Sequence, residues 1–170
     1  KRIAAICDRR FGVGADGVIT LQNHSKADFL MHYFNADCQL GSFCGNGGRC
    51  VVAFAKHLGI IDKQTNFAAY DGLHDASISG NIVSLSMQDV DDVQTYSTYA
   101  FLDTGSPHHV EFVKDTTDID VLTQGAKIAH NDTYGVEGTN VNFVALAKDR
   151  QIQIRTFERG VENETLSCGT

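Results

Sequence analysis

The stretch CGNGGRCVVAFAKHLG, residues 44–59, decides the fold of the first half of this chain. Its apolar residues recur at the i, i+3, i+4, i+7 spacing that places side chains on one face of a helix. They are Val51, Phe54, Ala55 and Leu58. Gly59 stands where a glycine commonly ends a helix, because glycine reaches the left-handed conformation at little cost. The pattern predicts a helix that begins at or directly after Cys44.

A cysteine at the start of a helix has distinctive chemistry. The first turn has unpaired backbone N–H groups and the positive end of the peptide dipoles, which lower the pKa of a thiol and attract carboxylate or phosphate groups. Glycines beside the cysteine let an anion approach the backbone closely. The alternative is a buried small residue in a tight turn, and the helix-start setting of Cys44 favours the chemical role.

The same local pattern occurs a second time near the end of the chain. Phe34-Asn35 leads to Cys44-Gly45-Asn46, and Phe157-Glu158 leads to Cys168-Gly169-Thr170. The gaps are nearly equal, nine residues from Asn35 to Cys44 and ten from Glu158 to Cys168. The repetition predicts two similar halves, residues 1–92 and 93–170, each presenting a cysteine at the start of a helix.

Strand signals surround the predicted helix and recur in the second half. In the first half they cover residues 28–35, 66–70, 76–79 and 82–87, with Gly80-Asn81 as a hairpin turn. In the second half they cover residues 99–103, 110–114, 139–147 and 151–157. Residues 118–129 are predicted to be helical, with Asp118 as the N-cap. This mixture of elements predicts an α/β (α+β) fold.

Composition excludes several classes of function. The 170 residues include 14 Lys plus Arg and 21 Asp plus Glu, for a formal net charge of −7, which argues against a nucleic-acid binder. No apolar run approaches the roughly 18 residues of a membrane span. The five cysteines are odd in number, which argues against a disulfide framework and for a reducing compartment, the cytoplasm. The six-residue spacing of Cys38, Cys44 and Cys50 does not provide a zinc knuckle, so no metal site is predicted.

Two thiols held at helix starts suit one class of reaction. Racemisation or epimerisation removes a proton from one face of a carbon and returns it on the other, so it needs two bases. One cysteine is then the thiolate and the other the thiol, and backbone N–H groups stabilise the charge that grows on the substrate carboxylate. Such a reaction requires no cofactor.

Six stretches of the chain resemble the diaminopimelate epimerase family, in the order and spacing of that family. They are FGVGADG (11–17), FNAD (34–37), FCGNGGRC (43–50), TGSPHHV (104–110), GTNVNFV (138–144) and RTFERGVENETLSCGT (155–170). The resemblance implies two similar domains, each a curved and mostly antiparallel sheet around a central helix, with the active site in the cleft between them. It also implies a PLP-independent isomerase that converts LL-2,6-diaminopimelate to the meso form in lysine and peptidoglycan-precursor biosynthesis.

The resemblance assigns roles to individual residues. Cys44 and Cys168 match the two catalytic thiols, and His108 and Glu158 match residues close to the reacting centre. Four residues match the backbone cradles of the reacting carboxylate: Gly45, Asn46, Gly169 and Thr170. Four match the groups that read the remainder of the amino-acid substrate: Asn35, Asn140, Glu158 and Arg159. The partner is a small amino acid, with no nucleic acid, membrane or metal, and the sequence leaves a homodimer open.

Some positions depart from the family pattern. Cys38 stands where family members usually have the glycine of an N-A-D-G turn, so it is strained if that turn needs a positive φ. Ser106 stands where many members have Asn in a G-N-P-H motif. The chain starts without Met and stops directly after Cys168-Gly169-Thr170, so we expect it to be truncated at both ends.

Three other interpretations stay open. A proline-type racemase also uses two thiols, although proline has no distal charged end for Asn35 and Asn140 to read. A Cys–His hydrolase built on Cys44 and His108 leaves Cys168 unused, and a non-catalytic amino-acid-binding paralogue would bind without exchange of the α-proton. Cys50 is expected to pack inward, His109 to face away from the site, and Arg155 to be an exposed strand residue.

Overall fold

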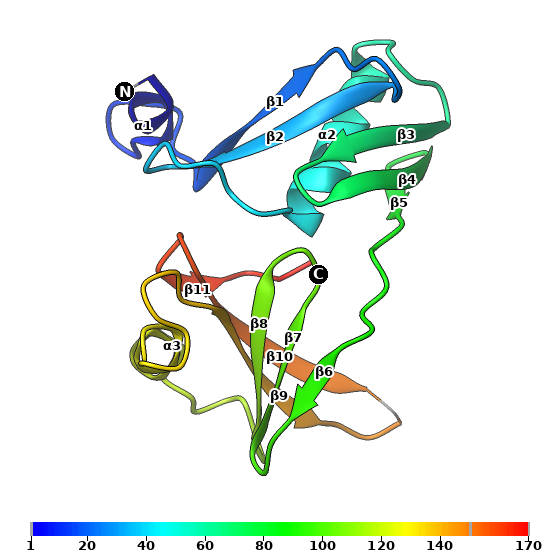
Figure 1. Ribbon diagram of the computed structural model, residues 1–170. Coiled ribbons are helices and arrows are strands. Elements are labelled where there is room, and N and C mark those ends of the chain that lie inside the picture. Colours follow the sequence, from blue (N-terminus) through cyan, green and yellow to red (C-terminus); the bar gives the residue numbers. More distant parts are fainter. Residues whose placement is uncertain (1, 150, 170) are drawn as a thin grey trace. The chain divides into compact units, whose positions relative to one another are not determined.

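The computed structural model describes residues 2–149 and 151–169, which form two compact units. The first comprises residues 2–88 together with Gly169, and the second comprises Asp89–Cys168. Figure 1 shows that each unit has its own sheet and its own helix beside that sheet. The expected boundary, after residue 92, falls at the start of the short strand β6 (Val93–Thr95).

The first unit is built on a five-stranded sheet of order β1-β2-β3-β4-β5. Its elements are α1 (Arg2–Cys7), β1 (Gly17–Gln22), β2 (Phe29–Asn35), α2 (Gly45–His57), β3 (Gln64–Ala69), β4 (Gly72–Ser79) and β5 (Ile82–Leu85). The β2–β3 pair is parallel and the other pairs are antiparallel. A parallel pair needs a crossover connection, and α2 provides it.

The core of the first unit lies between α2 and the sheet. Val51, Val52 and Ala55 are buried on the helix, and Phe29 and Phe67 stack beneath them with ring centroids 5.0 Å apart. The predicted helix and its glycine end are confirmed, because Gly59 has a φ of 71°.

The inward face of α2 is rotated from the face that the sequence spacing indicates. Phe54 and Leu58 are about half exposed, at 51% and 52%, because the buried face is centred on residues 51, 52 and 55. The expectation that Cys50 packs inward is wrong, since it lies on the exposed side of this rotated helix.

The second unit repeats the same arrangement in a six-stranded sheet of order β11-β10-β9-β8-β7-β6. Its further elements are β7 (Tyr99–Asp103), β8 (Pro107–Phe112), α3 (Val121–Ala129), β9 (Asn140–Leu146), β10 (Ile152–Glu158) and β11 (Asn163–Thr165). Again one helix, α3, connects the one parallel pair of this described sheet, β8 and β9. The predicted α/β class with mostly antiparallel sheets is confirmed.

The helix α3 packs on β9 and β10 through a small core. Val121 and Ala129 of the helix meet Val141, Phe143 and Phe157 of the sheet. The helix begins at Val121, two residues later than a cap at Asp118 would place it. Its N-cap is therefore Asp120 and not the predicted Asp118, because the Asp120 Oδ1 accepts a hydrogen bond from the Thr123 N–H at 3.1 Å.

Arg155 on β10 is more than the exposed strand residue that the sequence suggests. Its guanidinium forms two 2.7 Å bonds to the Glu164 carboxylate on β11. The same group donates to the carbonyl oxygens of Thr116 and Ile119, each at 2.9 Å. Arg155 therefore connects the β10–β11 hairpin to the loop that precedes α3.

The repeated sequence pattern has a structural counterpart before each cysteine. Phe34 of β2 forms an antiparallel bridge to Leu40, and Phe157 of β10 pairs with Glu164 of β11. Each cysteine follows the returning residue by four positions. Strand, return and cysteine thus occur in the same local order in both units.

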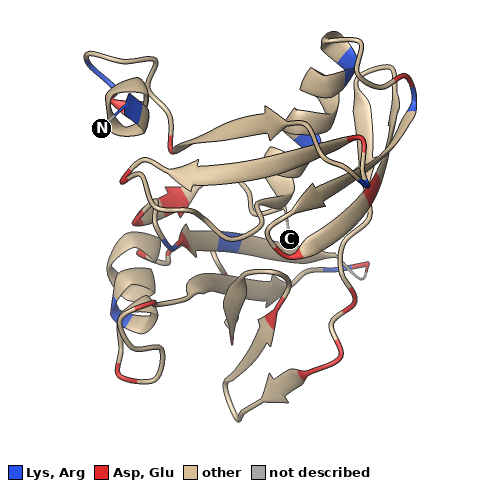
Figure 2. Cartoon of the chain, turned by 45° about the horizontal axis from the view of Figure 1, so that its top comes forward, with Lys and Arg blue, Asp and Glu red and all other residues tan. Residues whose placement is uncertain are grey.

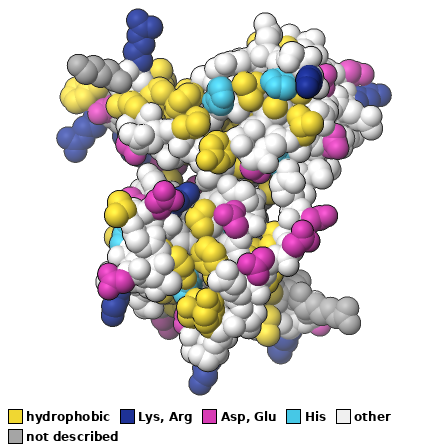
Figure 3. All heavy atoms as spheres, viewed as in Figure 1, with side chains coloured by type: hydrophobic (Ala, Val, Ile, Leu, Met, Phe, Trp, Pro, Cys, Tyr) yellow, Lys and Arg dark blue, Asp and Glu magenta, His cyan; other side chains and the backbone are white. Residues whose placement is uncertain are grey.

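The described Lys and Arg residues are scattered over the ribbon of both units (Figure 2). Hydrophobic side chains lie among polar ones on the face that Figure 3 shows. None of the helices within residues 2–149 and 151–169 is long and apolar enough to cross a membrane.

Candidate active site

Cys44 lies at the N-cap of α2, as the sequence predicts. Its backbone is extended, with φ −113° and ψ 110°, and its Sγ accepts a hydrogen bond from the Gly47 N–H at 3.3 Å. The thiol is partly exposed. A sulfur in this position lies against the positive end of the helix, which favours the thiolate over the thiol.

The glycines of the GNGG segment allow α2 to start close to the sheet. A Cβ on Gly47 would lie 2.7 Å from the Ile19 Cδ1, which is too short for a real contact. Gly45 and Asn46 are the first two residues of the helix, and the Gly45 carbonyl accepts a 2.9 Å bond from the Arg49 guanidinium. This first turn is the candidate cradle for a substrate carboxylate.

A buried aromatic pair supports the helix start from below. Phe43, directly before Cys44, stacks on the His74 ring with centroids 4.0 Å apart. The two nitrogens of His74 reach the Asp71 carboxylate at 2.9 Å and the Ser86 carbonyl at 3.2 Å. The sequence gives no local signal for this support, because it joins residues that only the sheet brings together.

Asn35, a candidate substrate-binding residue, ends β2 and begins a tight turn. Its N–H donates to the Gln39 carbonyl and its own carbonyl accepts from the Cys38 N–H, both at 2.9 Å. Cys38 has a φ of 76°, the left-handed conformation that glycine prefers. The turn therefore has the positive φ on which the expected strain at Cys38 depends.

Four candidate residues of the second unit lie at the same end of its sheet: His108, Asn140, Glu158 and Arg159. Because β8 and β9 are parallel and β10 is antiparallel to β9, the starts of β8 and β9 lie beside the end of β10. The Asn140 Nδ2 donates to the Ser106 Oγ, and the Asn140 Oδ1 accepts from the Arg159 N–H, both at 2.9 Å. Ser106 thus has a hydrogen-bond partner inside the protein. Glu158, the last residue of β10, lies next to Arg159 at the same end of the sheet.

His108 is buried among these residues on β8. Its Nδ1 lies 3.0 Å from the Asn142 Nδ2 on β9. Burial lowers the pKa of His108 to about 4, although the Asp103 charge and the hydrogen bond with Asn142 raise it; the Arg159 charge acts in the same direction as burial. The ring is therefore neutral near pH 7.

The neighbouring His109 points to the opposite face of the strand, as expected. Its Nδ1 lies 2.6 Å from the Tyr134 hydroxyl and its Nε2 lies 3.0 Å from the Glu111 carboxylate. Burial raises the pKa of Tyr134 to about 12, so this hydroxyl stays protonated. The alternation of a strand separates the two histidines into different surroundings.

Cys168 follows β11 in the second unit and is partly exposed. It lies at a hollow of about 560 Å³ whose walls come from β10, β11 and the residues after them. Gly169 clusters with the first unit, and Thr170 lies outside the described residues. The structure thus places Asn35, Cys44, Gly45 and Asn46 in the first unit, and His108, Asn140, Glu158, Arg159 and Cys168 in the second.

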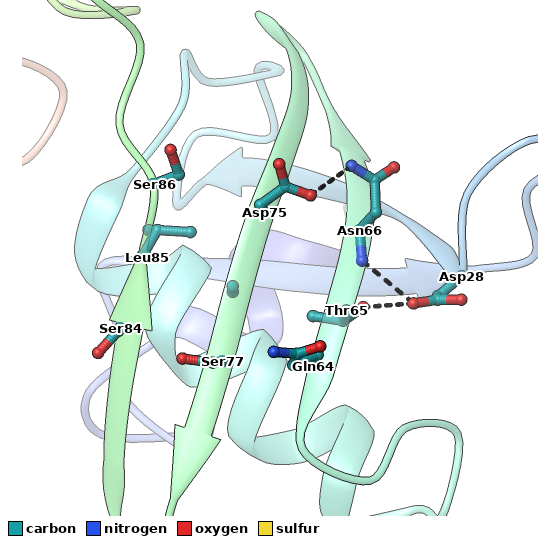
Figure 4. Close-up of a pocket in the computed structure, with 10 residues that line it drawn as sticks. Asp28, Gln64, Thr65, Asn66, Asp75, Ser77, Ser84, Leu85 and Ser86 are labelled. Atoms are coloured by element: carbon teal, nitrogen blue, oxygen red, sulfur yellow. Dashed lines mark hydrogen bonds between the residues drawn. The ribbon is translucent and has the colours of Figure 1, made fainter.

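A larger hollow, of about 650 Å³, lies on β3, β4 and β5 of the first unit (Figure 4). Its polar side chains bond to one another. Thr65 donates to the Asp28 carboxylate at 2.8 Å, and the Asn66 amide donates to the Asp75 carboxylate at 2.9 Å. None of the candidate site residues lines it. Within the described part of the chain, no group of three His, Cys, Asp or Glu residues is placed to hold a metal ion.

The fold is that of a class of proteins that includes PhzF-type phenazine biosynthesis proteins and hydroxyproline epimerases. A PhzF-family protein of Bacillus anthracis matches with a TM-score of 0.66 at 15% identity, over 93% of this chain and 63% of that one. A hydroxyproline epimerase of Agrobacterium vitis matches with a TM-score of 0.64 at 16% identity, over 91% and 57%. At this identity the likeness shows the fold alone.

The chain belongs to the diaminopimelate epimerase family, whose sequence model matches residues 1–90 and 100–170. The diaminopimelate epimerase of Flavobacterium psychrophilum is 54% identical over 169 residues, covering 99% of this chain and 66% of the relative. That of Chlorobaculum tepidum is 44% identical over 179 residues, covering 100% and 69%. The chain spans about two thirds of the length of these relatives.

Proposed function

We propose that this protein is an isomerase that converts LL-2,6-diaminopimelate to the meso form without a cofactor. The observation that carries the proposal is the Cys44 thiol at the N-cap of α2, 3.3 Å from the Gly47 N–H, in a chain of this family. The proposal includes the place of that reaction in lysine and peptidoglycan-precursor biosynthesis, in the cytoplasm.

The proposed reaction moves one proton between sulfur and carbon on each face of the substrate. The Cys44 thiolate takes the α-proton, which leaves the electron pair of the broken C–H bond on the α-carbon and its carboxylate. The Cys168 thiol then gives its proton to the opposite face and becomes the thiolate. The two cysteines exchange roles in the reverse direction. The proposed reaction therefore consumes no oxidant and uses no metal.

The charge that grows on the carboxylate needs hydrogen-bond donors. The N–H groups of the first turn of α2 at Gly45 and Asn46 are suited to this, because helix starts bind anions. Gly169 and Thr170 are proposed as the matching cradle after Cys168.

The remainder of the substrate carries an ammonium and a carboxylate group. Glu158 and Arg159 offer the complementary charges, and Asn35 and Asn140 offer amides. The carboxamide of Asn140 already holds the Ser106 hydroxyl and the Arg159 backbone, which leaves one amide hydrogen for a ligand. We propose that the protein binds a small amino acid as its substrate. We also propose a homodimer as its oligomeric state.

The direct test follows the α-proton of the substrate. The intact, reduced protein is incubated with LL-diaminopimelate in D2O beside its Cys44→Ser and Cys168→Ser variants, and the α-proton signal is followed by NMR. Loss of the signal with formation of the meso isomer, abolished in each variant, supports the proposal. A folded, reduced protein that exchanges no α-proton overturns it.

Parallel assays distinguish the rival functions. Exchange on proline that is faster than exchange on diaminopimelate would indicate a proline-type racemase. A covalent acyl-enzyme on Cys44 detected by mass spectrometry would indicate a hydrolase. Binding of diaminopimelate without exchange would indicate a binding paralogue.

A further inference from the structure

We propose that Asn142 and Thr156 hold His108 as a neutral ring with its hydrogen on Nε2. His108 then serves the site as a hydrogen-bond donor and not as a base. Asn142, Thr156 and the His109 carbonyl all belong to the second unit. The role of His108 toward a substrate rests on the epimerase function proposed above.

Three buried side chains form one line across β8, β9 and β10. The Thr156 hydroxyl donates to the Asn142 Oδ1 at 2.9 Å. The Asn142 Nδ2 in turn lies 3.0 Å from the His108 Nδ1. The three residues are 2%, 7% and 4% exposed, so water does not compete for these bonds.

The orientation of the Asn142 amide is fixed by a fourth group. Its Nδ2 also lies 3.1 Å from the backbone carbonyl oxygen of His109. A carbonyl oxygen can only accept, so the amide nitrogen and not the amide oxygen must face it. The Thr156 hydroxyl on the other side completes the assignment, because it can donate to the amide oxygen.

This orientation decides which ring nitrogen carries the hydrogen. One amide hydrogen of Asn142 goes to the His109 carbonyl and the other points at the His108 Nδ1. That nitrogen must therefore accept, and the neutral ring carries its hydrogen on Nε2.

Burial opposes a charged ring and lowers the pKa of His108 to about 4. The Asp103 charge and a hydrogen bond with Asn142 raise this pKa, and the Arg159 charge lowers it. Asn142 stabilises an imidazolium only when its amide oxygen faces Nδ1, and that orientation would set the oxygen against the His109 carbonyl.

A neutral Nε2–H donor fits a two-thiol reaction. In that reaction the protons move between sulfur and carbon, so an additional base at neutral pH would compete for them. A ring that cannot accept a proton at Nδ1 can still donate from Nε2 to an oxygen on which negative charge grows. Asn142 and Thr156 are therefore positioning residues: they act on the reaction only through His108.

The test reads the tautomer directly by NMR of the chain labelled with ¹³C and ¹⁵N in its histidines. The His108 signals are assigned by their loss in His108→Gln. We expect the Nε2–H tautomer at pH 7. In Thr156→Val the Asn142 oxygen loses its donor and only the His109 carbonyl orients the amide, so we expect a fraction of the Nδ1–H tautomer to appear beside the Nε2–H form.

The matched control is Thr165→Val. Thr165 lies directly opposite Thr156 on β11, and its buried Oγ1 has no hydrogen-bond partner among the described residues. Thr165→Val makes the same replacement of a hydroxyl by a methyl group as Thr156→Val, but it removes no hydrogen bond among the described residues. We therefore expect the His108 tautomer to stay unchanged. An equal shift in both variants would show that packing, and not the hydrogen bond, sets the ring.

A second variant reverses the polarity of the contact. In Asn142→Asp a carboxylate oxygen faces Nδ1, so we expect the Nδ1–H tautomer and a titration of His108 well above pH 4. In the intact protein the rate of α-proton exchange should fall by about 10-fold or more, since the donor is lost from its position. The pH profile of that rate should acquire the new titration.

The outcomes separate this inference from the proposed function. A wild-type ring that is charged at pH 7, or that carries its hydrogen on Nδ1, overturns the inference even if the protein epimerises diaminopimelate. A protein without epimerase activity whose ring is neutral and Nε2–H overturns the proposed function and leaves the tautomer assignment standing. Asn142→Asp with an unchanged exchange rate and pH profile overturns the role of His108 as a donor.

Discussion

The backbone N–H of Gly47 donates to the thiol of Cys44 over 3.3 Å, so one sulfur both caps α2 and carries the proposed chemistry. These two tasks respond differently to substitution. In Cys44→Ser the hydroxyl caps the helix at least as well as sulfur, so the protein should keep its stability and lose proton exchange. Activity and denaturant unfolding of the same variant measure both tasks.

The Cys44→Ala variant separates the cap from the chemistry. It removes the acceptor of the Gly47 N–H and should lower the free energy of unfolding by up to about 1 kcal/mol. A comparison of the Ser and Ala variants in urea provides the measurement. Equal stability of the two would show that the sulfur contributes nothing as a cap.

The sequence predicts those elements whose signals lie within one stretch of chain. The helix at residues 45–57 has an apolar period, a start and a glycine end, and β2 and the β4–β5 hairpin have equally clear patterns. Short elements lack such a signal. The helix α1 has six residues, and β6 and β11 have three each, too few for a period to show.

The candidate site, like the fold, was predictable from the sequence only where the signal is local. The setting of Cys44 follows from local pattern, and the roles of the other candidates come from resemblance. The line from Thr156 through Asn142 to His108 depends on the register of three strands, and its ends lie 48 positions apart in sequence. Pairing across a sheet is set by tertiary packing, which no local window of sequence reveals.

Cys38 should be a site where a single substitution stabilises the protein. Its φ of 76° costs an L-residue roughly 1–2 kcal/mol, and glycine avoids that cost but loses more backbone entropy on folding. The net expectation for Cys38→Gly is a gain of about 0.5–1 kcal/mol in the free energy of unfolding, measured in urea. Cys38→Ala retains the Cβ and should show no gain. A gain of equal size in both variants would place the cost in the sulfur and not in the backbone.

Gly125 should tolerate no side chain, although alanine usually favours a helix. A Cβ at this position of α3 would lie 2.4 Å from the Cβ of Phe157, which is fully buried. Gly125→Ala should therefore lower the free energy of unfolding by about 1–3 kcal/mol through overpacking. Gln124→Ala, on the exposed side of the same helix, controls for helix propensity and should be nearly neutral. Stabilisation by Gly125→Ala would show that α3 can move away from the sheet without cost.

The Arg155–Glu164 pair should make the second unit sensitive to acid. The hydrogen bonds from Arg155 hold the pKa of Glu164 below its ordinary value of 4.5. The folded state then binds fewer protons than the unfolded state around this pH. The contribution of the pair is fully present above pH 4.5 and is lost as the pH falls through the lower folded pKa.

This contribution appears as a difference between two thermal melts. Wild type should melt at a higher temperature than Glu164→Gln at pH 7, and the gap should close as the pH falls below 4.5. Glu137→Gln is the control, because the Glu137 side chain is exposed and forms no ion pair among the described residues. Arg155→Ala should lower the Tm more than Glu164→Gln does, since it also removes the bonds to the carbonyl oxygens of Thr116 and Ile119. A gap between wild type and Glu164→Gln that persists unchanged at pH 3 would show that the carboxylate charge is not what the pair contributes.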